Sequence, residues 1–358
     1  MRRSVLVLSA VLALGVVTPA HAGPGLVKLG PLPGDLGSRP VALNDAGEAA
    51  GVSVGSGAQH AVRWSRDGKV TQLPDLGSGD SSVSDLNNSG TVVGGAGGRA
   101  VQWDGDQVTV LATPPGVTAT RAWAISETGV VVGDAVVGQE RRAVKWVGNK
   151  LTVLATLPGA WTINASQVND RGFIAGTATF ADNSVHVVRW DPRGRVSDLG
   201  TFGGFTEVRA INASGVVVGS SVEPVTTQTR AFRSNGGRIE ALNGGDAHAY
   251  DINDFGYVVG DVETKQPRRV PAAWEADGAS VPLQEAPGTD ERASRVWSVN
   301  NAGVAVGESR GVPVRWVEGD TKPVVLPGGS GSAVQVNRSG LIAGTVQEGG
   351  YPQAVLWR

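Results

Sequence analysis

The chain has 358 residues, a net charge of −2, 52 glycines and no cysteine. Without cysteine it can form no disulfide framework, thiolate zinc site or cysteine nucleophile, and without a basic excess it lacks the electrostatic signature of a nucleic-acid-binding protein. A hydrophobic content of 41% supports a packed core, and glycine at about twice its average share predicts a chain that turns often.

Residues 1–22 have the features of a secretory signal peptide. Arg2 and Arg3 precede an apolar run from Val5 to Val17, and Ala20-His21-Ala22 has the small-x-small pattern of a cleavage site. The run is shorter than the ~20 residues that a membrane-spanning helix needs. We therefore expect cleavage after Ala22, a secreted or extracellular protein without a stable membrane anchor, and a single repeat domain over residues 23–358.

Next along the chain comes a unit that is repeated eight times. It consists of Asn-x-x-Gly, three mostly apolar residues and a second Gly, and its first Gly recurs at intervals of 37 to 47 residues. The copies begin at Asn44, Asn87, Ser126, Asn169, Asn212, Asn253, Asn300 and Asn337. Such self-similarity is typical of propellers and solenoids.

Each copy is expected to contain four short strands. An alternating segment such as 207–211 precedes the Asn, the Asn-x-x-Gly predicts a tight turn, and an apolar run such as Val216-Val217-Val218 predicts a strand covered on both faces. A third strand ends in Trp in seven copies, with Ser234 as the exception, and turn dipeptides such as Asp67-Gly68 lead to a fourth.

Four antiparallel strands in about 42 residues predict an all-β fold, an eight-bladed β-propeller. The chain stops after the third strand of copy eight, and residues 26–30 resemble the fourth strand at 196–200. We therefore expect the N-terminal strand to complete the last blade and close the ring. An open β-solenoid is the alternative.

The third strands carry a family resemblance. His60-Ala61-Val62-Arg63-Trp64 and its counterparts at 99–103, 142–146 and 353–357 are similar to the His-Ala-Phe-x-Trp core of HAF repeats of bacterial extracellular proteins. Residues 210–219, followed by Ala231-Phe232, are most similar to the full pattern, whereas Pro271, Pro313 and Ser234 depart from it. The resemblance implies secretion and a repeat fold, and it implies no particular activity.

Several patterns that could carry chemistry are better explained by structure. The recurrent Trp residues are expected in the core between blades rather than stacked on sugars. Gly51-Val52-Ser53-Val54-Gly55 matches a nucleophile-elbow string but lies on a predicted strand. His60 and His186 occupy equivalent positions in different copies, so we expect no metal site, no cofactor and no catalytic residue from these patterns.

The candidate binding site lies where the copies differ. Three and five residues before the turn Asn, side chains are expected to line the mouth of the channel, on the same strand face as the apolar residue just before the Asn. Aromatic and basic residues replace small ones at several of these positions, and Trp161 lies in a loop leading into one of the strands. The candidate ligand-binding residues are Arg121, Trp123, Trp161, Arg209, His248, Tyr250, Arg295 and Trp297.

Aromatic rings interleaved with Arg suit a polar or anionic ligand. The sequence therefore favours a secreted, monomeric, non-enzymatic binding or scaffolding module for an extracellular glycan, peptide or protein, with no nucleic-acid partner. An enzyme acting on extracellular polysaccharide, a hydrolase or lyase, is the alternative, and it would require convergent carboxylates or a His–carboxylate pair at the mouth. A purely structural surface protein is the second alternative.

Overall fold

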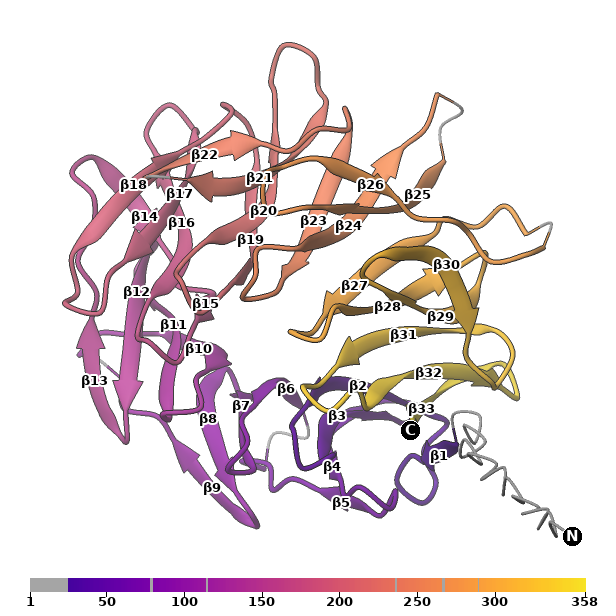
Figure 1. Cartoon of the computed structure of the whole chain (residues 1–358). Helices are drawn as coiled ribbons and strands as arrows, with labels where there is room; N and C mark the ends of the chain where they lie inside the picture. Colours follow the sequence, from indigo (N-terminus) through magenta and orange to yellow (C-terminus); the bar gives the residue numbers. More distant parts are fainter. Residues whose placement is uncertain (1–24, 78–79, 114, 236, 266–267, 289) are drawn as a thin grey trace, which may run out of the picture.

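The computed structural model describes residues 25–77, 80–113, 115–235, 237–265, 268–288 and 290–358. The predicted signal peptide lies outside these ranges. The described chain forms eight antiparallel sheets arranged in a ring, as an eight-bladed β-propeller (Figure 1). The axial region that the innermost strands surround is called the channel below. The all-β prediction is confirmed, and the open solenoid is excluded.

Blades are numbered in chain order, and within each the first strand is innermost. Blade 1 contains β2 (Gly37–Leu43), β3 (Ala49–Val54), β4 (Gln59–Trp64) and β5 (Val70–Gln72). Blade 2 contains β6 (Ser81–Leu86), β7 (Thr91–Ala96), β8 (Arg99–Asp104) and β9 (Gln107–Val110). Blade 3 contains β10 (Ala119–Ile125), β11 (Val130–Val137), β12 (Glu140–Val147) and β13 (Lys150–Val153). Blade 4 contains β14 (Ala160–Ile163), β15 (Gln167–Val168), β16 (Ile174–Phe180), β17 (Val185–Trp190) and β18 (Val196–Gly200).

The second half of the ring has the same order. Blade 5 contains β19 (Thr206–Ile211), β20 (Val217–Val222), β21 (Thr229–Asn235) and β22 (Arg238–Ala241). Blade 6 contains β23 (Ala247–Ile252), β24 (Val258–Glu263), β25 (Arg269–Trp274) and β26 (Ser280–Pro282). Blade 7 contains β27 (Arg295–Val299), β28 (Val304–Ser309), β29 (Val312–Val317) and β30 (Asp320–Val325). Blade 8 contains β31 (Gly331–Val336), β32 (Ile342–Glu348) and β33 (Tyr351–Trp357), and its outermost strand is β1 (Leu26–Leu29).

The two ends of the chain close the ring, as the sequence predicts. β1 pairs antiparallel with β33, from Leu26 opposite Trp357 to Leu29 opposite Ala354, and Figure 1 shows the two strands side by side. Leu29 is fully buried. The last blade is thus assembled from both termini, so local blade formation and ring closure are coupled.

The core lies between neighbouring blades. One cluster, for example, joins Ala61 and Leu73 of blade 1 to Val92 and Trp103 of blade 2. The seven Trp residues that end the third strands are at most 1% exposed. Each indole nitrogen donates to a backbone carbonyl near the outermost strand of the preceding blade, as Trp103 does to Pro74 at 2.7 Å. The core interpretation of these Trp residues is therefore confirmed.

Candidate functional site

The candidate residues lie on the innermost strands, at a β-bulge that recurs around the ring. In seven of the eight innermost strands the pairing register shifts at the third residue before the turn Asn (for example Trp123, between Ala122 and Ala124). In blade 4 the innermost strand is instead split into β14 and β15. A bulge adds one unpaired residue and redirects its side chain, so this position faces the channel.

The second Gly of each repeat explains how the bulge fits. A Cβ atom at Gly133 would overlap the carbonyl oxygen of Arg121 on the neighbouring strand. The same overlap with the residue five before the Asn occurs at the other seven second glycines, 51, 94, 176, 219, 260, 307 and 344. The glycine is needed because the bulged backbone comes too close for any side chain.

The bulge also corrects one expectation. In blade 3, Arg121 lies opposite Asp134, and Ile125 lies opposite Val131. Directly opposed residues share a face, and Val131 and Asp134 are an odd number of residues apart on β11, so they face opposite sides. The apolar residue before the Asn therefore lies on the face opposite to the channel-facing arginine. The prediction of a shared face was wrong because the extra residue reverses the alternation.

Five candidate residues converge in blades 5 to 7 around a buried carboxylate, that of Asp261. This Asp261 cluster consists of Arg209, His248, Tyr250, Asp261, Arg269, Arg295 and Trp297. Asp261 is 0% exposed. Its Oδ1 atom lies 3.1 Å from His248 Nδ1 and accepts from Arg269 Nη1 at 2.6 Å, and its Oδ2 atom accepts from the Tyr250 hydroxyl at 2.9 Å.

Rings and guanidinium groups continue the Asp261 cluster toward the channel. The Tyr250 and Trp297 ring centroids are 4.7 Å apart, and the Arg209 guanidinium lies 5.5 Å from the Tyr250 centroid. Arg295 lies 5.6 Å from the Trp297 centroid, and its Nε is 3.3 Å from Asp261 Oδ2. These contacts join three blades into one surface of aromatic and basic groups.

Two pKa shifts describe the charge state of this surface. Burial acts to raise the pKa of Asp261, but hydrogen bonds from His248 and Arg269 and the charge of Arg269 outweigh it, so the pKa lies below its usual value. Burial, followed by the negative charge of Asp261, raises the pKa of Tyr250 well above its usual value. Near neutral pH the Asp261 cluster therefore holds an ionised carboxylate beneath a protonated phenol.

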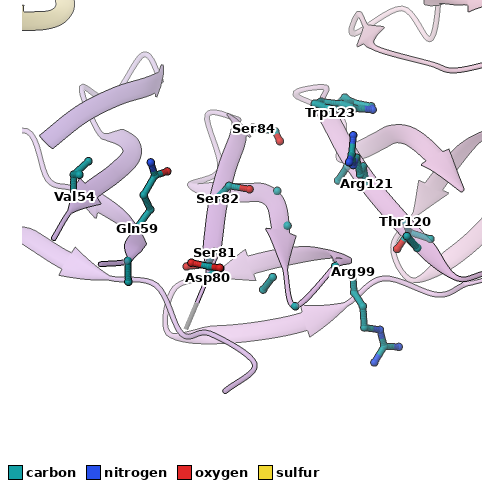
Figure 2. Close-up of a pocket in the computed structure, with 18 of the residues that line it drawn as sticks. Val54, Gln59, Asp80, Ser81, Ser82, Ser84, Arg99, Thr120, Arg121 and Trp123 are labelled. Atoms are coloured by element: carbon teal, nitrogen blue, oxygen red, sulfur yellow. The ribbon is translucent and has the colours of Figure 1, made fainter. Parts of the chain in front are cut away.

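Arg121 and Trp123 form a separate group in blade 3. The Trp123 indole donates a hydrogen bond to Asp134, which is 0% exposed, and the Arg121 guanidinium lies 5.7 Å from the Trp123 centroid. Both residues line a cavity of about 930 Å³, here called the Trp123 cavity. Figure 2 shows Ser82 and Ser84 of β6 on the side of this cavity facing Arg121 and Trp123.

Trp161 belongs to neither group. It lies in strand β14 rather than in a loop, and its indole donates to the Phe180 carbonyl of its own blade at 3.2 Å. Its side chain is 46% exposed. Among the residues described, no hydrogen bond or ring contact joins Trp161 to the other candidates, so the structure does not bring it into the site.

Sequence reasoning missed the acidic residues beneath the aromatic ones. Asp134, Asp261 and Glu308 each follow the second Gly of a repeat, where other blades have Val, Gly, Thr or Ser. They lie opposite Arg121, His248 and Arg295 respectively. The signal was available, because unusual residues at this position accompany Trp123, Tyr250 and Trp297 in the same three blades.

A third group of basic residues lies on the other side of the Asp261 cluster. Arg39, Arg292 and Arg295 line a cavity of about 500 Å³ with Glu308 and Ser332. Burial raises the pKa of Glu308, and the nearby charge of Arg295 offsets part of this effect. This cavity thus has three guanidinium groups and one carboxylate in its lining.

The opposite end of the channel is predominantly acidic. The residue that follows the turn Asn is Asp45, Glu127, Asp170 or Asp254 in four blades and Arg338 in blade 8. Arg338 lies 3.7 Å from Asp45 and 3.8 Å from Asp170. Burial, together with the charges of Asp170 and Asp45, raises the pKa of Glu127, although the backbone hydrogen bond from Asn88 and Arg338 oppose the shift.

The nucleophile-elbow string has a structural role. Ser53 is fully buried in β3; it donates to Asp35 at 2.5 Å and accepts from the backbone of Leu32 at 2.9 Å. His60 lies 3.1 Å from the same carboxylate, so the carboxylate separates the hydroxyl from the imidazole. A serine nucleophile requires the imidazole as its direct partner, and this arrangement does not provide it.

The described residues contain neither a metal-binding cluster nor a helix that could span a membrane. No group of three or more His, Asp or Glu side chains there is arranged to hold a metal ion. The same residues contain no helix with the length and apolarity that a membrane span requires.

Comparisons with known proteins support the fold. No protein-family model and no curated protein matches the sequence. Among solved structures, puromycin hydrolase is similar with a TM-score of 0.55 at 12% identity, over 87% of this chain and 59% of that one. Prolyl endopeptidases give a TM-score of 0.50 at 12% identity, over 82% and 46% of the two chains, and streptogramin B lyase gives 0.48 at 10%, over 80% and 95%. At these identities the likeness extends to the propeller fold alone.

Proposed function

We propose that this protein is a secreted, non-enzymatic binding or scaffolding module that holds an extracellular glycan, peptide or protein at the arginine-rich mouth of its channel. The observation that carries the proposal is the convergence of Arg209, His248, Tyr250, Arg295 and Trp297 on one surface. Packing of the fold does not require these side chains, because Val and Ser occupy the same positions in other blades.

The chemistry of this surface suits a polar ligand with negative charge. Guanidinium groups bind carboxylate and sulfate through paired hydrogen bonds, and aromatic faces contact the apolar side of a ring. The buried carboxylate of Asp261 fixes the orientation of Tyr250 and His248 before a ligand arrives. Preorganisation of this kind lowers the entropic cost of binding.

A triple variant tests the proposal. We expect Trp123→Ala, Trp297→Ala and Arg209→Ala together to abolish binding of any ligand found on a glycan and peptide array, while the circular dichroism spectrum stays unchanged. A control variant carries Phe255→Ala and Arg171→Ala, two exposed residues in the turns at the opposite end of the channel, and should bind normally. Unchanged affinity in the triple variant would remove the mouth from consideration.

Export is tested separately. The charged start, apolar run and small-x-small pattern of residues 1–22 support cleavage after Ala22. Expressed in a bacterial host, the exported protein should begin at Gly23 by N-terminal sequencing or intact mass. A full-length product retained in the cell would contradict the proposed localisation.

A second candidate function is supported by one observation, the His248–Asp261 pair. Its Nδ1 contact with the buried carboxylate leaves Nε2 as the other nitrogen of a ring that is partly exposed at the mouth. A carboxylate that orients an imidazole is the usual arrangement of a general base. If the protein cleaves extracellular polysaccharide, wild type should release new chain ends and His248→Gln should not, whereas a binding module would release none in either form.

A further inference from the structure

The Trp123 cavity exists because blade 2 has almost no side chains at the mouth. Its wall contains Ser82 and Ser84 on β6, together with Gly94, Gly95, Gly97 and Gly98 on the β7–β8 side. At the position of Gly95 the other blades have Val, Asp, Thr, Ser or Glu. The missing side chains leave about 930 Å³ of space between blades 1 and 3, which is a typical volume for a ligand pocket.

The side of this cavity that blade 3 supplies is built differently. Trp123 is 38% exposed, yet its indole nitrogen is bonded to a fully buried carboxylate, that of Asp134. The hydrogen bond holds the ring plane in place while part of the ring stays exposed. A fixed and partly exposed indole beside hydroxyl groups is the arrangement that stacks on the apolar face of a sugar ring.

Arg121 adds a positive charge that the protein does not neutralise directly. Its guanidinium lies against the Trp123 ring, and no carboxylate among the described residues lies within 4 Å of it. Arg99 also lines the cavity, at its margin, and has no such partner in the described chain either. Asp80 is the one carboxylate among the lining residues, and Asp134 behind Trp123 lies 3.5 Å from a different arginine, Arg141.

We propose that the Trp123 cavity binds one hexuronate unit of an acidic polysaccharide, with the sugar ring against Trp123, the carboxylate on Arg121 and ring hydroxyls on Ser82 and Ser84. This inference rests on the proposed binding function and names its ligand class. A sugar is favoured over an acidic peptide because the cavity sets an indole ring beside the hydroxyl groups of Ser56, Ser82 and Ser84, which suits a ring with one apolar face and hydroxyl groups around its edge.

Gly95 offers a variant that fills the cavity without disturbing the strand. A Cβ atom there would meet Ser82 Oγ at 3.5 Å and the Arg99 carbonyl at 3.8 Å, which are ordinary contacts. Thr occupies the equivalent position in blades 4 and 8, as Thr177 and Thr345. Gly95→Thr should therefore fold with an equal or higher melting temperature while it narrows the space for the ligand.

The experiment is calorimetric titration of the protein, beginning at Gly23, with polygalacturonate, alginate and hyaluronate. Neutral dextran and polyglutamate are titrated alongside. We expect wild type to bind at least one polyuronate, more weakly as salt is added, and to bind neither dextran nor polyglutamate. Arg121→Gln should weaken that binding about tenfold or more, because it removes a charge-assisted hydrogen bond. Gly95→Thr should weaken it by a similar factor, because its side chain occupies space that the sugar ring needs.

Arg171→Gln is the matched control, because Arg171 is an exposed arginine in a turn at the opposite end of the channel and the substitution removes the same charge. It should weaken binding less than threefold. Failure to bind any of the three polyuronates, or binding that Arg121→Gln and Gly95→Thr leave unchanged, would overturn the inference. If polyuronate binding were insensitive to Arg121→Gln and Gly95→Thr but lost in Trp297→Ala, the inference would fail while the proposed function would stand. Preference for polyglutamate would assign the cavity to an acidic peptide and overturn the inference as well.

Discussion

The turn asparagines link neighbouring blades through hydrogen bonds. At seven of the eight junctions the Asn side-chain amide donates to the backbone carbonyl of the corresponding residue in the next blade, as Asn300 does to Asn337 at 2.9 Å. Asn337 donates to the Asn44 carbonyl at 2.9 Å and so links blade 8 to blade 1, where the ring closes. The exception is Ser126 in blade 3, whose hydroxyl accepts from its own turn, at Val130, and cannot reach Asn169.

Ser126→Asn should complete this ring of amides. The new side chain would keep the local acceptor and add one buried hydrogen bond to the carbonyl of Asn169, so we expect the unfolding free energy to rise by about 1 kcal/mol. Denaturant unfolding at constant m-value measures the change. Ser126→Ala is the control and should lower the unfolding free energy, because it leaves the Val130 amide without its acceptor. A less stable Ser126→Asn protein would show that the junction lacks room for the amide.

Two partly buried aspartates, Asp85 and Asp251, accept hydrogen bonds from backbone amides of neighbouring blades and respond to pH. Asp85 accepts from Leu86 at 2.8 Å and Ile125 at 2.9 Å, and Asp251 accepts from Ile252 and Val299 at the same two distances. Burial raises the pKa of each carboxyl to about 6, although the hydrogen bonds act in the opposite direction.

The raised pKa of Asp251 fixes the sign of its pH dependence. The folded state binds the proton more tightly than the unfolded state, so the contribution of Asp251 to stability is full below pH 4 and declines as the pH rises toward 6. The unfolding free energy of wild type minus that of Asp251→Asn should therefore be more positive at pH 4 than at pH 7, by up to about 3 kcal/mol. Urea unfolding at both pH values measures it, and Asp85→Asn repeats the test at the other site. A difference independent of pH would show that neither carboxyl titrates as described.

At the scale of the strand, the bulge and the second Gly form one unit. The bulge directs the third residue before the Asn into the channel, and the glycine opposite admits the bulged backbone. Trp123, Arg209, Tyr250 and Trp297 all occupy this position. The repeat therefore provides a backbone that presents one variable side chain per blade without a change in the sheet.

Substitutions at Gly94 and Gly95, adjacent residues of β7, test whether the bulge requires the second Gly of the repeat. A Cβ atom at Gly94 would overlap the Ser82 carbonyl, whereas one at Gly95 makes only ordinary contacts. Gly94→Ala should lower the unfolding free energy by about 1–3 kcal/mol, and Gly95→Ala should leave it equal or raise it slightly. Thermal and denaturant unfolding compare the two. Equal effects would mean that the bulge does not depend on the glycine.

At the scale of the whole molecule, the ring determines two features: how the first and last blades are joined, and how charge differs between the two ends of the channel. β1 supplies the outer strand of blade 8, and Gly30, the residue that follows β1, supplies the carbonyl that accepts from the Trp64 indole of blade 1 at 2.8 Å. One end of the channel carries Arg39, Arg121, Arg209 and Arg295 with the carboxylates of Asp134, Asp261 and Glu308 behind them, whereas the other carries four carboxylates with Arg338. A net charge of −2 hides this separation, which would steer an anionic ligand toward one end.

Removal of residues 25–30 tests closure. The change exposes the edge of β33 and leaves the Trp64 indole without its acceptor, so we expect a lower melting temperature and a tendency to aggregate. Light scattering and calorimetry compare this protein with a chain beginning at Gly23. A synthetic peptide of residues 24–31 added in trans should restore part of the stability. Full stability without the strand would show that seven blades and a three-stranded eighth suffice.

Much of the architecture was predictable because the determinants are local and repeated eight times. An Asn-x-x-Gly turn, an apolar strand and a strand ending in Trp each need only a few consecutive residues, so the number of blades and the closing role of residues 26–29 could be predicted from the pattern. Candidates such as Tyr250 and Trp297 could be found for the same reason, as departures from a regular unit.

The sequence by itself therefore determined the unit, its number and the positions where the copies differ. Only the tertiary structure decided that Arg209, His248, Tyr250, Arg295 and Trp297 share one surface, that Trp123 faces a separate cavity and that Trp161 joins neither. It also revealed the bulge, which reverses the alternation of side chains, and Asp261 beneath the aromatic rings. The physical reason is that contacts across strands and blades depend on register and bulging. A shift of one residue moves a side chain to the other face, and no local pattern records that shift.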